Sequence, residues 1–127
     1  MDTIADMLVK IKNAGAAEKQ TTSFPFSKFK YSLASVLLKE GFVEDVKKRG
    51  NKTKKIMVRL KYQDGKHRIN GVKRISKISN RVYLGKDKVY IPRQGFGILI
   101  VSTPKGLLTS KEARRQKTGG EAICEIW

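Results

Sequence analysis

The sequence predicts an α+β fold of two small lobes. In the first 40 positions the apolar residues recur at helical spacing, whereas later in the chain they recur at every second position, as in strands. Glycine-containing turn signals separate these segments. With 127 residues, of which 39% are apolar, the chain can bury only a modest core. We expect an N-terminal lobe over residues 1–75 and a C-terminal, mostly antiparallel β lobe with one short helix over residues 76–127.

Two amphipathic helices are expected in the first lobe. Apolar side chains at helical spacing over residues 3–14, behind a possible cap at Asp2 and before Gly15, predict the first helix. Ser27 is placed to cap a second helix, which Gly41 ends. The expected apolar face of the second helix consists of Phe29, Leu33, Val36 and Leu37.

Strand periodicity follows the second helix. From Ile56 to Tyr62 apolar and polar residues alternate, which predicts a half-buried strand with a basic outer face. Turn signals at 50–51 and 64–65 divide residues 43–75 into an expected meander. Residues 21–26 are a short extended segment between the helices. The predicted order is therefore helix, strand, helix, strand, strand.

The second lobe is predicted to be mostly strands. Thr109 and Glu112 have the spacing of a capping box, which predicts a short helix over residues 110–117 that Gly119 and Gly120 end. The expected strands cover residues 82–84, 88–91, 97–102 and 121–127.

The positive charge is concentrated in the middle of the chain. The formal net charge is +17. Residues 1–46 carry six basic and six acidic side chains, residues 47–93 carry 17 and two, and residues 94–127 carry five and three. Such an excess favours a polyanionic partner, and nucleic acid is the commonest one. The basic run 47–55 is interpreted as a solvated loop that would meet phosphate on a ribonucleoprotein.

Membrane and secreted classes are disfavoured. The longest apolar runs are far shorter than the roughly 20 residues that span a bilayer, so no membrane partner is expected. Asp2 and Asp6 lie where a signal peptide would carry positive charge. The single Cys124 cannot form an intrachain disulfide, which favours a reducing cytoplasm.

Catalytic groups are also missing from the pattern. His67, the only histidine, lies beside a predicted turn, and Cys124 lies in a predicted strand without a second cysteine. Gly95 and Gly97 lack the third glycine of a dinucleotide loop, and no Walker lysine follows. We expect no enzyme, catalytic residue, metal, cofactor or small-molecule substrate.

The segment from Ser102 to Gly106 carries the most informative local chemistry. The hydroxyls of Ser102 and Thr103 can hydrogen-bond to RNA, Lys105 can contact phosphate, and Gly106 lets a backbone approach closely. The same five residues also make an ordinary turn. Local chemistry alone leaves both interpretations open.

A wider pattern resembles the family of the universal eighth protein of the small ribosomal subunit. Its C-terminal signature is similar to Ser102-Thr103-x-x-Gly106, Ala113-Arg114, Gly119-Gly120-Glu121, Cys124 and Trp127. Further blocks that resemble the family are Thr3–Leu8, Ile11–Ala14, Pro25–Lys28 and Glu40–Phe42. The resemblance extends from residue 2 to residue 127.

The resemblance implies an RNA-binding structural protein of the small ribosomal subunit. Family members bind the central domain of small-subunit ribosomal RNA and support platform assembly, beside neighbouring ribosomal proteins and in some cases with their own messenger RNA. The C-terminal lobe would be the principal RNA-binding region. The motif positions carried over are Ser102, Thr103, Gly106, Gly120 and Glu121, with Tyr83 as a stacking aromatic. Apart from the resemblance, Lys105 is expected to contact phosphate, and Lys28 and Lys30, at the start of the second helix, are expected as secondary contacts.

Several of these residues have structural alternatives. Tyr83 could be a core aromatic, and Gly119 and Gly120 could serve only to end a helix. Glu121 would repel phosphate and is expected to orient the neighbouring loop. The rival functions are a DNA-binding protein, which should carry an Arg- and Asn-rich recognition helix, and an RNA-processing enzyme, which should carry acid–base or metal groups.

Overall fold

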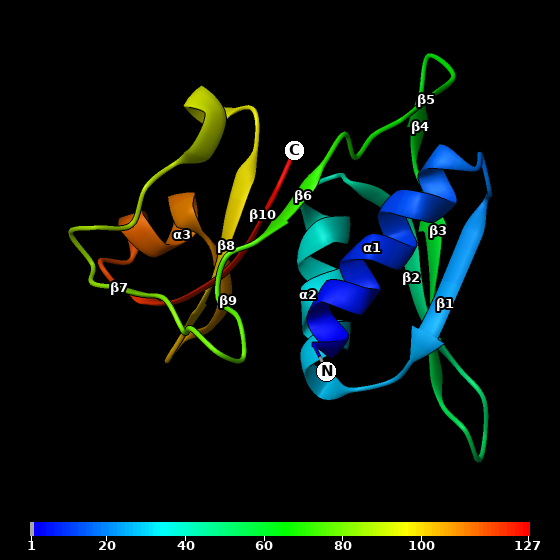
Figure 1. The fold of residues 1–127 in the computed structure, drawn as a ribbon, viewed down its shortest axis with the longest axis horizontal. Coiled ribbons are helices and arrows are strands. Elements are labelled where there is room, and N and C mark those ends of the chain that lie inside the picture. Colours follow the sequence, from blue (N-terminus) through cyan, green and yellow to red (C-terminus); the bar gives the residue numbers. More distant parts are fainter. Residues whose placement is uncertain (1) are drawn as a thin grey trace. The chain divides into compact units, whose positions relative to one another are not determined.

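The computed structural model describes residues 2–127 and divides them into two compact units. The N-terminal unit is Thr3–Asn70, and the C-terminal unit is Gly71–Trp127 together with Asp2 (Figure 1). Both contain helix and antiparallel sheet, which confirms the predicted α+β fold of two lobes. The division falls at Asn70, whereas the sequence analysis placed it near residue 75.

The N-terminal unit is a three-stranded antiparallel sheet with both helices on one side (Figure 1). The sheet order is β1-β3-β2, and β4 and β5 form a separate hairpin. The elements are α1 (Thr3–Ala16), β1 (Thr21–Pro25), α2 (Lys28–Lys39), β2 (Val43–Arg49), β3 (Lys55–Leu60), β4 (Tyr62–Gln63) and β5 (Lys66–His67). This order confirms helix, strand, helix, strand, strand.

Helix α2 begins as predicted, and of its expected apolar face Leu33 and Leu37 are buried and Val36 is half-buried. The Ser27 hydroxyl accepts a hydrogen bond from the backbone N–H of Lys30 at 3.1 Å, so the predicted cap is confirmed. The prediction that Phe29 is part of the buried face was wrong, because its side chain is 37% exposed. The buried positions of α2 are Lys30, Leu33, Ala34 and Leu37. Lys30 and Ala34, which the prediction did not include, complete the buried stripe of this helix.

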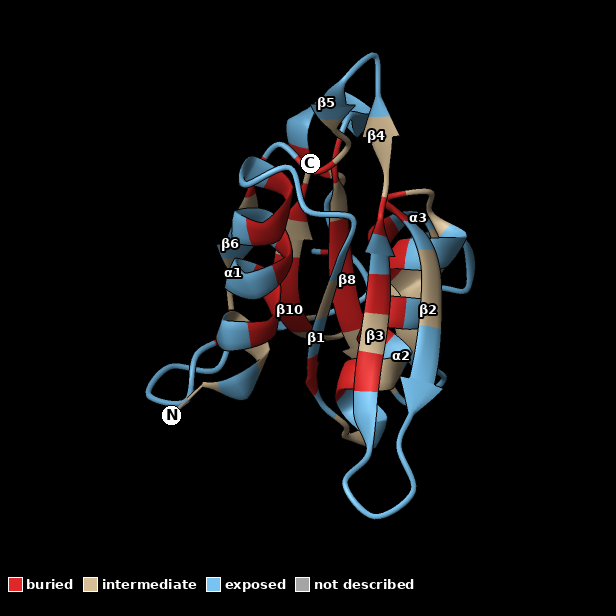
Figure 2. Ribbon diagram, turned by 90° about the vertical axis from the view of Figure 1, so that its right-hand side faces the viewer, coloured by how far each residue is buried: buried red, intermediate tan, exposed pale blue. Residues whose placement is uncertain are grey.

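Strand β3 has the predicted alternation. Ile56, Val58 and Leu60 are buried, while Lys55 and Arg59 are exposed (Figure 2). The buried positions face α1 and α2 and form the core of this unit. The opposite face of β3 is basic, as the sequence predicted.

The C-terminal unit is a five-stranded antiparallel sheet with order β6-β10-β8-β9, in which β7 also pairs with β10. Its elements are β6 (Val72–Arg74), β7 (Tyr83–Leu84), the 3-10 helix η1 (Pro92–Gly95), β8 (Ile98–Thr103), β9 (Gly106–Thr109), α3 (Ser110–Arg115) and β10 (Gly120–Ile126). Because β6 pairs with β10, residues 72–74 extend this sheet and not the expected meander of the first lobe.

Two local expectations for this unit were wrong. Residues 88–91 form no strand, since the N–H of Lys88 donates to the carbonyl of Gly85 at 2.8 Å and closes a turn. Val89 alone from this run is buried, where it packs with Leu99 and Val101. Strand β9, which the sequence analysis missed, pairs with β8 in register from Ile100 to Thr103.

The short helix is confirmed together with its capping box. The Thr109 hydroxyl accepts a hydrogen bond from the N–H of Glu112 at 3.3 Å, and the N–H of Thr109 donates to the Glu112 carboxylate at 3.3 Å. Ala113 of α3 is buried against the core strands. The box therefore fixes where the chain leaves β9 and turns onto the sheet.

Candidate nucleic-acid interface

The segment from Ser102 to Gly106 is a β-hairpin turn between β8 and β9. Thr103 pairs with Gly106, and Pro104 and Lys105 form the two-residue turn. Gly106 has a backbone φ of +105°, a conformation that residues other than glycine rarely adopt. The segment therefore leads into strand β9, which in turn leads into helix α3. Pairing from Ile100 to Thr103 fixes the register of the residues in this hairpin.

The two hydroxyls of this segment are not equivalent. Thr103 Oγ1 donates to the carbonyl of Gly106 at 2.8 Å and accepts from the N–H of Lys105 at 3.0 Å. The Thr103 hydroxyl thus holds the turn together. Ser102 is half-buried at the end of β8, and no hydrogen bond to its hydroxyl occurs within residues 2–127. Ser102 is consequently the hydroxyl that remains available to a partner.

Strand pairing places Ser102, Glu121 and Tyr83 in one row across three strands. Glu121 of β10 lies directly opposite Ser102 of β8 on one side and Tyr83 of β7 on the other. Directly opposite residues in an antiparallel sheet point to the same face, with Cβ atoms about 4.5–5.5 Å apart. Tyr83 is 70% exposed, so the alternative of a core aromatic is wrong. An exposed ring and an available hydroxyl therefore share one sheet face.

Glu121 links this row to the preceding loop. One carboxylate oxygen accepts hydrogen bonds from the Ser76 hydroxyl and from Arg81 Nη1, the latter at 3.1 Å. Ser76 is fully buried, and its Oγ in turn accepts from the N–H of Val82 at 3.1 Å. Glu121 thus orients the segment that carries Tyr83.

Arg81 belongs to the same surface and was missed in the sequence analysis. Its side chain is about half exposed, and its guanidinium is held by Glu121. The signal for it was the alternation in Arg81-Val82-Tyr83, which puts Arg81 and Tyr83 on one side of an extended chain.

The paired glycines let the strands approach each other closely. A Cβ atom on Gly120 would lie 2.0 Å from the carbonyl oxygen of Ser102, and one on Gly119 would lie 2.2 Å from that of Leu84. Both neighbours are backbone atoms that cannot move aside without disturbing the sheet. The glycines therefore do more than end α3, because they bring β10 against β7 and β8.

The three predicted lysines lie in different settings. Lys105 is exposed on the hairpin turn, and its ammonium donates to the carbonyl of Gln116 at 3.4 Å. Lys28 and Lys30 belong to the N-terminal unit, at the start of α2. Lys28 is exposed, whereas Lys30 is only 7% exposed and its Nζ lies 5.8 Å from the centre of the Phe24 ring. Lys30 therefore presents little charge to a partner.

Comparison with known proteins identifies the family. The model described as Ribosomal protein S8 matches residues 2–127. The chain belongs to the ribosomal protein S8 family. It is 44% identical to a protein of Persephonella marina over 99% of this chain and 98% of the relative, 46% identical to one of Caldicellulosiruptor bescii over 100% and 98%, and 47% identical to one of Acinetobacter baumannii over 98% and 96%. All three relatives are called small ribosomal subunit protein uS8.

Membership of the S8 family confirms the resemblance that the sequence motifs indicated. The family is a structural, non-enzymatic component of the ribosome, so the chain has a structural role in the ribosome and is not an enzyme. Residues 2–127 contain no helix long and apolar enough to cross a membrane.

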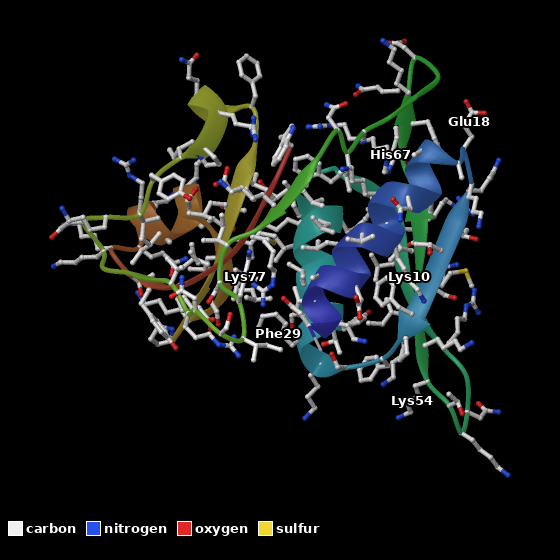
Figure 3. The ribbon with its side chains drawn as sticks, viewed as in Figure 1. Lys10, Glu18, Phe29, Lys54, His67 and Lys77 are labelled. Carbon is white, nitrogen blue, oxygen red and sulfur yellow. The ribbon has the colours of Figure 1, made fainter. Side chains whose placement is uncertain are left out.

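The two residues considered for catalysis are buried or half-buried in this S8-family chain. Cys124 is fully buried on β10, and burial raises the pKa of its thiol to about 12, so it stays protonated. His67 packs against Gly15 at the end of α1 (Figure 3), and burial lowers the pKa of its imidazole. Among residues 2–127, no three His, Cys, Asp or Glu side chains gather as metal ligands.

A basic pocket in the C-terminal unit was not predicted. It has a volume of about 300 Å³ and is lined by Lys86, Asp87, Val89, Arg114 and Lys117. Three cations and one carboxylate surround it, so the pocket favours anions. Arg114 follows Ala113 in the family signature, but nothing in the sequence placed it beside residues 86 and 117. The pocket adds positive potential to the unit that carries Ser102 and Tyr83.

Proposed function

We propose that the protein binds small-subunit ribosomal RNA in its central domain and supports assembly of the platform. The row of Tyr83, Glu121 and Ser102 carries this proposal, because it presents an exposed aromatic ring and an available hydroxyl on one rigid face. Aromatic stacking and hydroxyl hydrogen bonds are the usual means by which proteins recognise unpaired or distorted RNA. Lys105 is exposed on the neighbouring hairpin turn, and half-exposed Arg81 forms an ion pair with Glu121 of the row.

Each residue of this surface has a distinct proposed role. Tyr83 stacks on a base or ribose, and Ser102 hydrogen-bonds to a ribose hydroxyl or base edge. Lys105 contacts phosphate, and the hairpin at Thr103 and Gly106 lets the RNA backbone approach. Two further residues act on the protein side: Gly120 brings the strands together, and Glu121 positions the Tyr83 segment.

The N-terminal unit has a smaller part in this proposal. Lys28 is exposed and is retained as a secondary phosphate contact, whereas the burial of Lys30 leaves it out of the proposed surface. The remaining partners are neighbouring proteins of the small subunit, on cytoplasmic ribosomes. We do not extend the proposal to the protein's own messenger RNA, because no described feature favours it.

The rival proposal of a DNA-binding protein has less support. A recognition helix enters the DNA major groove and reads bases along one of its faces. Here α3 has only six residues and neither α1 nor α2 contains an arginine, while the aromatic and hydroxyl groups lie on strands and a hairpin. A sheet surface with an exposed tyrosine suits splayed RNA better than the regular groove of B-form DNA.

Filter binding tests this proposal directly. The full chain is titrated against a structured transcript of the small-subunit central domain and against duplex DNA of equal length, in the same salt. We expect the RNA to bind at least tenfold more tightly, and footprinting to show one protected region. Equal affinity for the DNA duplex would contradict the proposal.

A further inference from the structure

The sheet of the N-terminal unit has an outer face that neither helix covers. Pairing in β1-β3-β2 places Pro25, Lys55 and Arg49 in one row, Ser23, Met57 and Lys47 in the next, and Thr21, Arg59 and Asp45 in the third. The alternate positions of β3, which are Ile56, Val58 and Leu60, are buried on the helix side. These three rows, called the outer face below, therefore point away from α1 and α2.

The outer face carries four cations and one carboxylate. The cations are Lys47, Arg49, Lys55 and Arg59. The carboxylate, Asp45, lies 3.7 Å from Lys47 Nζ and also accepts from the N–H of Val46. Within residues 2–127 no carboxylate lies within 4.0 Å of the charged groups of Arg49, Lys55 or Arg59. Three cations are therefore uncompensated on one small sheet.

The hairpin that joins β2 and β3 extends this charge. Every residue from 47 to 55 is exposed (Figure 2), and Lys52 and Lys54 add two more cations near its tip. Lys54 lies on the hairpin beyond the sheet (Figure 3). Lys48 lies at an alternate position, opposite Ile56, and its Nζ is 4.7 Å from the centre of the Phe26 ring.

The strand register places like charges opposite each other, which lowers the stability of the protein when no partner is bound. Arg49 lies directly opposite Lys55, and like charges at opposite positions of an antiparallel pair destabilise the sheet. A bound polyanion would remove that repulsion. Without such a partner, an acidic residue at position 49 or 55 would make the hairpin more stable than the two cations do.

We propose that the outer face is a second RNA-binding surface, which holds the phosphate backbone of a double-helical RNA segment. This inference rests on the proposed function. The exposed hydroxyls of Thr21 and Ser23 lie beside the cations and can donate to phosphate oxygens. The rows repeat about every 6.6–6.8 Å along each strand, so the cations form a regular array that suits a regular polyanion.

The outer face lacks aromatic side chains and has few large apolar ones, which limits the kinds of partner that it can bind. A protein partner is usually held by aromatic or large apolar anchors, whereas half-buried Met57 is the largest apolar side chain in the three rows. Single-stranded RNA is held by stacking on aromatic rings, and the three rows contain none. Phosphates of a duplex need neither, so this surface attracts RNA without reading its sequence.

The test compares two triple variants of the full chain. The first, Lys47→Gln, Arg49→Gln and Lys55→Gln, removes three charges from the outer face. The matched control, Lys12→Gln, Lys39→Gln and Lys66→Gln, removes three exposed charges from α1, α2 and the β4–β5 hairpin of the same unit. Both are checked by thermal melting, and both are titrated with central-domain RNA over a range of salt.

The outer-face variant is expected to lose about tenfold or more in affinity, and its slope of log affinity against log salt should fall by about two to three. The control should change the slope by less than one. Equal losses in both variants would overturn the inference, because net charge alone would then explain binding. So would an unchanged slope in the outer-face variant.

Footprinting separates this inference from the proposed function. If the outer-face variant loses one protected helix but keeps the region that Ser102→Ala weakens, both stand. If the parent chain binds the RNA and the outer-face variant protects the same nucleotides, only the second surface is refuted. If the parent chain fails to bind, the proposed function fails and the second surface fails with it.

A measurement on the chain without substitutions avoids the possibility that a variant fails to fold. Lysines are acetylated with and without bound central-domain RNA, and each site is quantified by mass spectrometry. Lys47 and Lys55 should be at least threefold protected by RNA, while Lys12 and Lys39 should react equally in both samples. Protection of Lys12 and Lys39 to the same degree would overturn the inference.

Discussion

The two proposed RNA surfaces are built from opposite kinds of chemistry. The row of Tyr83, Glu121 and Ser102 holds one ring, one available hydroxyl and a carboxylate that is already hydrogen-bonded. The outer face of the N-terminal sheet holds four cations and no ring. Directional groups on a rigid row can discriminate between RNA sites, whereas exposed cations attract any phosphate. In our proposal, discrimination between RNA sites and attraction to phosphate therefore belong to separate sheets of one small chain.

The largest effect should come from the core that supports the cationic sheet. Leu37 of α2 is fully buried, so Leu37→Ala should lower the free energy of unfolding by about 2–5 kcal/mol. Neighbouring Leu38 is 38% exposed, and Leu38→Ala serves as the control with a change of about 0.5 kcal/mol or less. Denaturant melts measure both. RNA affinity per folded molecule should stay the same; a loss of affinity without a loss of stability would mean that Leu37 lies on a binding surface.

Removal of the available hydroxyl should weaken specific binding. Ser102→Ala leaves a polar RNA group without a partner and should cost about 1–3 kcal/mol, roughly tenfold to a hundredfold in affinity. Binding to unrelated RNA should not change. Thr103→Ala is the contrast, because it removes the two hydrogen bonds of the hairpin turn and should lower thermal stability as well. If Ser102→Ala bound RNA with wild-type affinity, the segment from Ser102 to Gly106 would be only a turn, without a role in RNA binding.

Tyr83 should matter for affinity without affecting salt dependence. Loss of one stacked base costs about 1–3 kcal/mol, and an uncharged ring contributes nothing to counterion release, so Tyr83→Ala should lower affinity at constant salt slope. Tyr90 is a matched control in the same unit, with 40% exposure and a hydroxyl that donates to Glu125 at 3.0 Å. Filter binding at several salt concentrations measures the affinity and the salt slope of both variants. Equal losses for Tyr83→Ala and Tyr90→Ala would argue against stacking at Tyr83.

Lys105 should give a smaller and purely electrostatic effect. Its loss removes one phosphate contact, so Lys105→Ala should reduce the salt slope by about 0.7–0.9 with a modest change in affinity. Lys111→Ala, an exposed lysine on α3, is the control. A drop in specificity with an unchanged slope would show that Lys105 contacts a base, which would make the hairpin more selective than we propose.

The smallest expected effect is a pH response confined to the N-terminal unit. Burial lowers the pKa of His67 below its ordinary value of 6.5, and its buried Nε2 has no hydrogen-bond partner among residues 2–127. The unfolded chain therefore binds the proton more readily than the folded chain, so stability is full above about pH 6.5 and falls as the pH drops below it. Thermal melts at pH 7.5 and pH 5.5 measure this, and His67→Gln should abolish the difference. A rise in stability at the lower pH would contradict the burial effect.

Local signals in the sequence determined much of this protein. The two N-terminal helices, the Ser27 cap and the Thr109 capping box each depend on residues within one or two turns, so they could be predicted without knowledge of the rest of the chain. The alternation in β3 likewise identified which residues are buried. The motif blocks indicated the family, and its model matches residues 2–127.

Which of these residues meet depends on the pairing of strands that are far apart in the sequence. Tyr83, Glu121 and Ser102 come from three separate segments, and the pairing of β7, β10 and β8 puts them in one row. Register likewise sets Arg49 opposite Lys55, and the hairpin turn occupies the Thr103 hydroxyl. Strand order and register depend on contacts between residues far apart in sequence, and a shift by one residue would move every side chain to the other face. No local pattern contains that information, so a sequence can indicate which residues could bind RNA without showing which of them share a surface.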